Sequence, residues 1–385
     1  MEKLFFDLIR SEILDEKITP ASPSAEDLRG AYEFSKTHDL GHLTAEAILK
    51  NFSSVIDAKF KGELEKSVYT AIYRYKRIEH ELGRITELFS ENKIPHVLLK
   101  GILVRKYYPK PYMRTSCDID ILVKAEDIER ARELLISSLD YKFDAKSDHD
   151  VAFFTPTGLH FEMHYSLIET DVVDELDAPL LCAWDECELL SGEYTYTLKQ
   201  PLFYYYHIAH MAKHYVNGGC GIRPLIDLYF LDTKGDFAPA PCEEILKKGG
   251  ILTFCEAARK LSGVWLLGRE HSDLTRTMEE YILHSGVYGT MENKISTSRV
   301  KKGGARYVLG RIFMPYSKLI YTYPSLEGRK ILTPIYEIRR WLRIIFSGRR
   351  RAAVNEVKSA LTKSEGDISK TEKMLNDLGF KLANK

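Results

Sequence analysis

A long apolar stripe organises the first 92 residues of the chain. Between residues 64 and 89 the apolar positions recur at steps of three and four, which places them on one face of an α-helix. These positions are Leu64, Val68, Ile72, Tyr75, Ile78, Leu82, Ile85 and Phe89. Asn92 and Pro95 follow the stripe and indicate where the helix ends. We therefore predict a helical region over residues 1–92.

Short apolar runs replace this pattern after residue 92, and such runs are typical of buried strands. The predicted strands are Ile94–Lys100, Cys117–Val123, Tyr141–Asp144, Val151–Thr155 and Leu159–Tyr165. Pro156–Gly158 supplies a hairpin turn, and Glu126–Leu139 has the spacing of an amphipathic helix. We predict that residues 93–170 form a compact core with a small mixed sheet.

Helical spacing dominates again beyond residue 170. It is found in residues 201–215, 223–231 and 242–267, so we assign residues 171–298 to a helical domain that completes a cleft. Residues 299–385 form a last, mainly helical region rich in basic and aromatic residues. The predicted fold class is α+β, with a small mixed sheet flanked by mainly helical N- and C-terminal regions.

Composition narrows the class of protein. The 385 residues have a formal net charge of zero, so any binding of a polyanion requires a local basic patch. The six cysteines form no CxxC pair, which indicates reduced thiols rather than a disulfide frame or a zinc ribbon. The chain begins without the pattern of a signal peptide, and no apolar run reaches the roughly 18 residues of a spanning helix. We expect a cytoplasmic protein with no transmembrane segment.

Three carboxylates are the main candidates for chemistry. Asp118 and Asp120 are two residues apart in a predicted strand, so both side chains project from the same face. Glu162 lies on the polar face of a second predicted strand, which could place it beside the aspartates. Such a cluster is costly unless cations neutralise it, and Mg²⁺ prefers oxygen ligands. An exposed sheet face without catalysis would produce the same alternation.

The order of these motifs resembles the polymerase-beta-like nucleotidyltransferase superfamily. More narrowly, it is similar to a bacterial family of uncharacterised nucleotidyltransferases, the NTP-transferase-5 group. The resemblance covers roughly residues 10–350. It is carried by LLKG (98–101), Tyr108, Arg114, DIDILV (118–123), FEMHYSL (161–167), HIAHMAKHY (207–215) and IRPLIDL (222–228).

This resemblance implies a metal-dependent transfer of a nucleoside monophosphate from an NTP to an acceptor hydroxyl, with release of pyrophosphate. The catalytic residues would be Asp118, Asp120 and Glu162, which would also bind Mg²⁺ or Mn²⁺, and Glu162 could serve as general base. The implied nucleotide-binding residues are Lys100, Gly101, Arg114, Thr115, Ser116, Lys213 and His214. The acceptor could be a small molecule, a sugar, a protein or RNA.

One position departs from the superfamily. Gly101 would let the backbone approach the phosphates, but Ile102 follows it where the superfamily usually has serine. Lys100 together with Arg114, Thr115 or Ser116 could replace the missing serine contact. The alternative function is a catalytically degenerate nucleotide-binding protein, or a membrane-peripheral accessory protein of a surface-polymer or antibiotic pathway.

A histidine cluster allows three interpretations. His207, His210 and His214 share one helical face. They could bind zinc, or they could be buried and bonded to Asp227 or to backbone. In the third interpretation, His214 and Lys213 face the catalytic cleft and contact phosphate or the acceptor. On the predicted strand, His160 and His164 flank Glu162. His164 could orient that carboxylate by a hydrogen bond, or it could simply be a polar residue on a solvated sheet face.

The basic C-terminal region also allows three interpretations. Residues 299–351 hold fourteen Lys or Arg and only two acids, Glu327 and Glu337. Within them, residues 335–351 combine an amphipathic helix with Arg349–Arg351. This segment could pack on preceding helices, lie on an anionic membrane surface, or hold a polyanionic acceptor such as RNA.

Overall fold

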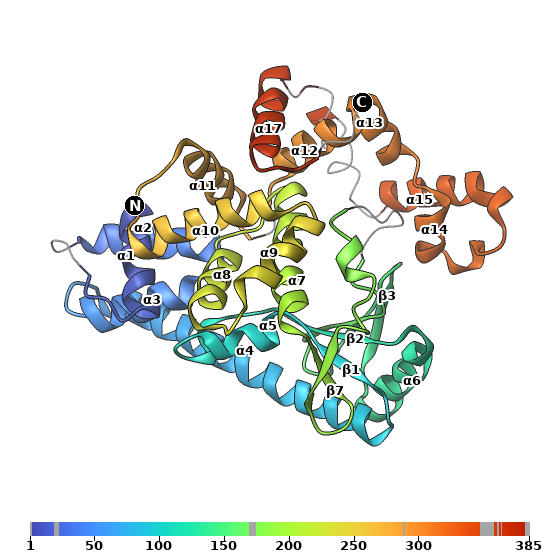
Figure 1. Cartoon of the computed structure of the whole chain (residues 1–385), viewed down its shortest axis with the longest axis horizontal. Coiled ribbons are helices and arrows are strands. Elements are labelled where there is room, and N and C mark those ends of the chain that lie inside the picture. Colours follow the sequence, from blue (N-terminus) through green and yellow to red (C-terminus); the bar gives the residue numbers. More distant parts are fainter. Residues whose placement is uncertain are drawn as a thin grey trace.

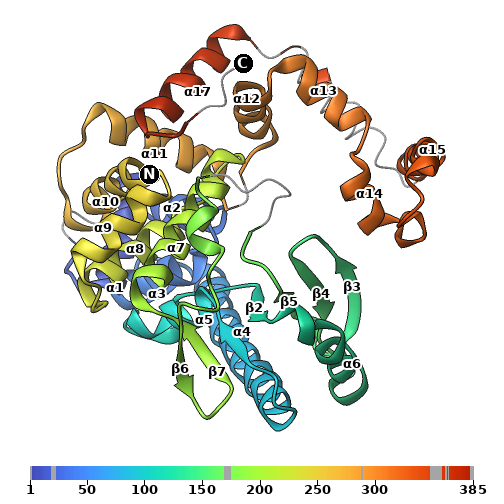
Figure 2. The same cartoon turned by 45° about the vertical axis from the view of Figure 1, so that its right-hand side comes forward.

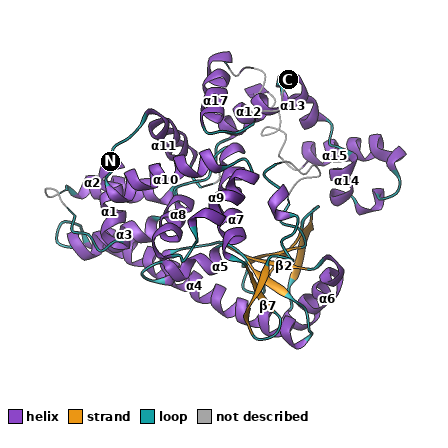
Figure 3. Ribbon diagram, viewed as in Figure 1, coloured by secondary structure: helices purple, strands orange, loops and turns teal. Residues whose placement is uncertain are grey.

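The computed structural model describes residues 2–18, 23–168, 175–287, 289–346, 358–359, 362 and 364–381. A seven-stranded mixed sheet lies at one end of the molecule, and helices make up most of the rest (Figures 1 and 3). This architecture confirms the predicted α+β class.

The sheet runs in the order β3-β4-β5-β2-β1-β7-β6. Its strands are β1 (His96–Leu98), β2 (Asp118–Val123), β3 (Lys142–Lys146), β4 (Asp150–Phe154), β5 (His160–His164), β6 (Cys187–Ser191) and β7 (Thr195–Leu198). β2 pairs in parallel with β5, in a register that sets Asp120 directly opposite Glu162. β1 pairs antiparallel with β2 on its other side and parallel with β7.

Two of these strands were not predicted. β6 and β7 lie in the segment that we assigned to helices, and they form an antiparallel hairpin that extends the sheet past β1. The strands predicted between residues 94 and 165 are all present, with ends that differ by a few residues. The sheet is therefore built from two separate stretches of chain, 96–164 and 187–198.

One face of the sheet packs on α4 (Ala58–Glu91) and α6 (Ile128–Leu139). Ile119 and Ile121 of β2 are fully buried in this layer, where they join Ile85 of α4. Because strand side chains alternate, Asp118 and Asp120 project from the other face of the sheet. The hydrophobic contacts thus fix which face carries the carboxylates.

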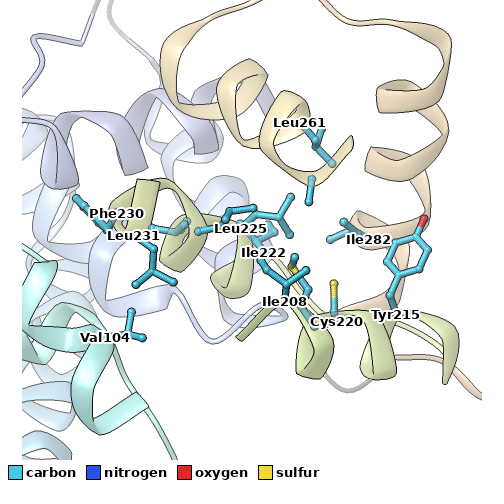
Figure 4. Close-up of a cluster of buried hydrophobic side chains, with 14 of the residues drawn as sticks. Val104, Ile208, Tyr215, Cys220, Ile222, Leu225, Phe230, Leu231, Leu261 and Ile282 are labelled. Atoms are coloured by element: carbon cyan, nitrogen blue, oxygen red, sulfur yellow. The ribbon is translucent and has the colours of Figure 1, made fainter. Parts of the chain in front are cut away.

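The helices that precede the sheet in the sequence and those that follow it share one hydrophobic core. The N-terminal helices are α1 (Glu2–Ile13), α2 (Ala25–Lys36) and α3 (Gly41–Phe52). The later helices are α7 (Gln200–Val216), α8 (Arg223–Lys234), α9 (Pro239–Lys248), α10 (Leu252–Leu267) and α11 (Asp273–Ser285). Figure 4 shows part of this core, which includes Leu225 of α8, Leu261 of α10 and Ile282 of α11.

The C-terminal region contributes to that core and also extends away from it (Figure 2). Its helices are α12 (Met291–Lys302), α13 (Gly304–Ile312), α14 (Tyr316–Thr322), α15 (Thr333–Phe346) and α17 (Glu365–Asp377). Leu375 of α17 is buried in the shared core, whereas Leu319, Tyr323 and Leu326 form a small cluster of their own around α14. Within the described ranges, no helix is both long and apolar enough to span a bilayer.

Candidate active site

The pairing of β2 with β5 brings the predicted carboxylates together. Asp120 and Glu162 are register partners, and Asp118 lies one pleat away on the same face, opposite His160. Ligand atoms of Asp120, Glu162 and His164 all lie within 4.8 Å of one another. The prediction that Glu162 lies beside the aspartates is confirmed.

The two aspartates lie in opposite electrostatic environments. Burial raises the pKa of Asp118, and the nearby charges of Asp120 and Glu162 raise it further. Burial would also raise the pKa of Asp120, but Lys100 and His164 outweigh it and hold that pKa well below its usual range. The site therefore concentrates negative charge that only adjacent cations offset.

His164 is one of those cations. Its Nε2 lies 3.3 Å from Asp120 Oδ1 and 3.5 Å from Glu162 Oε2, so it bridges the two strands. Burial alone would lower the pKa of His164, yet its bonds to Asp120 and Glu162 raise it to about 9. His164 was expected to orient Glu162 by a hydrogen bond; its closer partner is instead Asp120, and Glu162 is the more distant one.

Lys100 is the second cation, and the backbone at its position is strained. Its Nζ lies 3.8 Å from Asp120 Oδ2. Lys100 lies two residues after the end of β1 and immediately before α5 (Gly101–Val104). Its backbone has φ 36° and ψ −113°. Positive φ is rare for a residue with a side chain, and such strain concentrates at functional sites. The fold holds this ammonium beside the carboxylates at an energetic cost.

Arg114 and Gly101 form a structural contact. The Arg114 guanidinium forks onto Asp227 of α8, with Nη2 2.8 Å from Oδ2 and Nε 3.2 Å from both carboxylate oxygens. Tyr108 donates a hydrogen bond of 2.6 Å to the same carboxylate. A Cβ at Gly101 would lie 2.2 Å from Arg114 Nη1. Arg114 thus joins the sheet core to α8, and Gly101 leaves room for it.

The hydroxyls of Thr115 and Ser116, two of the implied nucleotide-binding residues, are hydrogen-bonded to other residues. Thr115 Oγ1 donates to Asp39 Oδ2 at 2.9 Å, and Ser116 Oγ accepts from Arg105 Nη2 at 3.0 Å. Arg223 Nη1 donates both to Asp39 at 3.1 Å and to the Thr115 carbonyl at 3.0 Å.

Arg223 is a site residue that sequence reasoning missed. Its charge partly opposes the burial and the neighbouring carboxylates that raise the pKa of Asp118, and its Nη1 donates to the Thr115 carbonyl, three residues before Asp118. The available signal was its place as the first residue of α8, within the IRPLIDL motif.

The histidines of α7 divide into two environments. His207 is buried, its Nε2 lies 3.2 Å from the Pro224 carbonyl, and burial lowers its pKa. This agrees with the buried, backbone-bonded interpretation. His210 and His214 approach each other at 3.0 Å, and the charge of Lys100 adds to burial in lowering the pKa of His210. His210 is therefore an α7 histidine whose pKa responds to the charge of Lys100.

Neither the zinc interpretation nor the Lys213 phosphate contact gains geometric support. Among the residues that the structure describes, the groups able to hold a metal include none of the three α7 histidines. Lys213 Nζ pairs with the buried Asp177 at 3.0 Å. A second group able to hold a metal, His149, Asp150 and His164, adjoins the carboxylates through the shared His164.

Together these features define an α+β protein with an acidic centre, on adjacent parallel strands, that could hold a metal ion. A family model described as an uncharacterised nucleotidyltransferase matches residues 24–266, which include all seven strands. The chain belongs to this family. No curated protein and no solved structure gave a significant match.

Proposed function

We propose that the chain transfers a nucleoside monophosphate from an NTP to an acceptor hydroxyl and releases pyrophosphate. The observation that carries this proposal is the register of β2 with β5, which sets Glu162 opposite Asp120 and beside Asp118. Membership of the nucleotidyltransferase family supports the transfer class.

The donor set fits a hard divalent cation. Asp118, Asp120 and Glu162 offer carboxylate oxygens, which Mg²⁺ and Mn²⁺ prefer. Burial, together with the charges of Asp120 and Glu162, raises the pKa of Asp118, and a cation would offset both effects. These three residues would hold the ions, with His164 supporting Asp120 from the side. When bound, such ions neutralise charge on the phosphates and on the departing pyrophosphate.

The remaining groups have roles that follow from their positions. Lys100 supplies a fixed positive charge beside Asp120, suited to a phosphate oxygen. Glu162 has 28% of its side chain exposed against 9% for Asp120, so it is the carboxylate better placed to reach an incoming acceptor. In the proposed step the acceptor oxygen bonds to the α-phosphorus, its proton passes to a Glu162 carboxylate oxygen, and the bond from the α-phosphorus to pyrophosphate breaks.

The test compares Asp120→Asn with a matched control, Asp140→Asn. Each purified protein is incubated with labelled NTPs, Mg²⁺ or Mn²⁺, and cell extract as the source of acceptor. We expect Asp120→Asn to lower label transfer by about two orders of magnitude or more, because a ligand of the cation is lost. Asp140 lies in a left-handed cap of α6 that asparagine tolerates, so its variant should transfer normally.

Unchanged transfer by a folded Asp120→Asn variant would contradict the proposal, as would full activity in excess chelator. Circular dichroism establishes that each variant is folded. The alternative of a degenerate nucleotide-binding protein predicts a different result: metal-dependent NTP binding by the wild type, with no pyrophosphate released in any extract. The Thr115 and Ser116 hydroxyls already bond to other residues of the protein, so their contribution to nucleotide binding has to be measured directly. NTP binding and NTP turnover are therefore measured separately.

A further inference from the structure

Helix α15 presents its apolar side to solvent. Ile335, Ile338, Leu342 and Phe346 have 61%, 63%, 47% and 83% of their surface exposed. They follow one another at steps of three and four, so they form one stripe along the helix, joined by the exposed Ile345. A helix that only packs on its own protein turns such a stripe inward.

The inward side of α15 carries the polar groups. Glu337 and Arg340 are each only 7% exposed and pair with each other at 2.9 Å. Glu337 Oε1 accepts from the Met314 backbone N–H at 2.7 Å, and Arg340 Nη2 donates to the Ile312 carbonyl at 2.6 Å. Trp341 Nε1 donates to the same carbonyl at 3.0 Å.

These bonds fix the rotation of the helix. Turning the isoleucines inward would break the charged and indole hydrogen bonds to residues 312–314. Breaking them would leave polar groups without partners. The apolar stripe is therefore held outward by specific contacts, and large exposed apolar patches of this kind mark interaction surfaces.

The surrounding charge identifies what could cover the stripe. Residues 299–346 hold eleven Lys or Arg against two acids, and one of those acids, Glu337, is paired inside. Arg339 and Arg343 border the stripe on one side, over the ring of Tyr323 at 5.2 and 5.7 Å. An apolar stripe edged by arginines and a tryptophan matches the interface of an anionic lipid bilayer.

We propose that α15 lies in the surface of an anionic membrane, with its isoleucine stripe in the acyl region and its arginines among the headgroups. Its 14 residues are too few to span the roughly 30 Å hydrocarbon core, so the contact is peripheral. This assignment does not depend on the proposed transfer reaction.

The test is flotation of the full-length protein with vesicles of phosphatidylcholine alone or mixed with phosphatidylglycerol. We expect flotation with the anionic vesicles and much less with the neutral ones. Ile338→Asp/Leu342→Asp should abolish it, because charges would enter the acyl region. Leu189→Asp/Leu190→Asp, at two exposed leucines of the distant β6 edge, is the matched control and should float normally.

A second pair of measurements isolates the electrostatic part. Arg339→Ser/Arg343→Ser should weaken partitioning by roughly fivefold per arginine at low salt, and added salt should reduce this difference. Circular dichroism confirms that the variants are folded; all four substituted positions of α15 are exposed.

Failure of the wild type to float with anionic vesicles overturns the proposal, and so does normal flotation of a folded Ile338→Asp/Leu342→Asp variant. In the former case two measurements identify the alternative occupant. A dimer in sedimentation that this variant dissociates assigns the stripe to a second copy of the chain. If the wild type binds RNA and the Ile338→Asp/Leu342→Asp variant binds it equally well, the arginines of α15 contact RNA and the apolar stripe does not.

Discussion

At the scale of single residues, Arg114 and Asp227 form an ion pair that is almost fully buried. Their side chains are 9% and 1% exposed, and Tyr108 adds a third group to the same network. Burial would lower the pKa of Arg114, but Asp227 outweighs it and raises that pKa, so the guanidinium stays charged. Forming a buried ion pair adds little to stability, because both charges lose their hydration. Removing one partner lowers stability strongly, because the other charge stays buried without compensation.

Replacing Asp227 with asparagine tests this role. The shape is kept while the charge is lost, so Arg114 remains charged and buried without a counterion. We expect Asp227→Asn to lower the free energy of unfolding by about 3–5 kcal/mol, measured by urea denaturation. Glu79→Gln breaks an exposed pair with Lys76 and should leave the midpoint unchanged. Equal effects of the two substitutions would show that the Arg114–Asp227 pair has no special structural role.

At the scale of elements, the junction of β1 with α5 connects strain to function. β1 has only three residues, and the chain turns from its end into α5 through Lys100 at φ 36°. The turn points the lysine ammonium to Asp120, which lies on the neighbouring strand β2. The strained backbone conformation of Lys100 thus places its ammonium group beside Asp120.

A comparison of Lys100→Gly with Lys100→Ala separates the two effects. Both variants lack the ammonium, so both should lose most nucleotidyl transfer. Glycine adopts positive φ without steric cost, so we expect Lys100→Gly to be more stable than Lys100→Ala by about 1 kcal/mol in thermal denaturation. If alanine were as stable as glycine here, the backbone at position 100 would not be strained.

At the scale of the whole molecule, the regions before and after the sheet are one packing unit. Their shared core runs from Phe5 to Leu378. His38 lies at a contact between them, because the neighbouring Thr37 carbonyl accepts a hydrogen bond from the Val287 backbone after α11. His38 is 1% exposed, and burial lowers its pKa from 6.5 to about 4. The division of the chain into four domains remains a prediction.

This buried histidine makes global stability depend on pH. Below pH 6.5 the unfolded chain binds a proton that the folded chain excludes, so stability falls as the pH drops from 6.5 to about 4. The loss attributable to His38 reaches about 3 kcal/mol. We expect His38→Asn to flatten the dependence of unfolding free energy on pH over this range. His284→Asn, at an exposed histidine of α11, should keep the wild-type slope. A slope unchanged by His38→Asn would mean that His38 titrates alike in both states.

Much of the site could be predicted because it depends on strand alternation. The sequence around Asp118 and Glu162 alternates apolar and acidic positions, and that period is a property of the strand backbone itself. β6 and β7 were missed because they are short and partly exposed, so their hydrophobic pattern is weak. The contact of Arg114 with the nucleotide, which the family resemblance implies, stays a prediction. Its bond to Asp227 could not be predicted because the two residues are 113 positions apart.

The sequence by itself determined the faces: which side of β2 is acidic, where the long helix α4 runs, and that the tail is basic and amphipathic. These features are periodic or compositional, so neighbouring residues suffice to establish them. Tertiary structure alone decided the partners, namely the parallel register that opposes Asp120 to Glu162, the fork of Arg114 onto Asp227, and the outward rotation of α15. Such pairings depend on the path of the chain between distant segments, which local pattern does not encode.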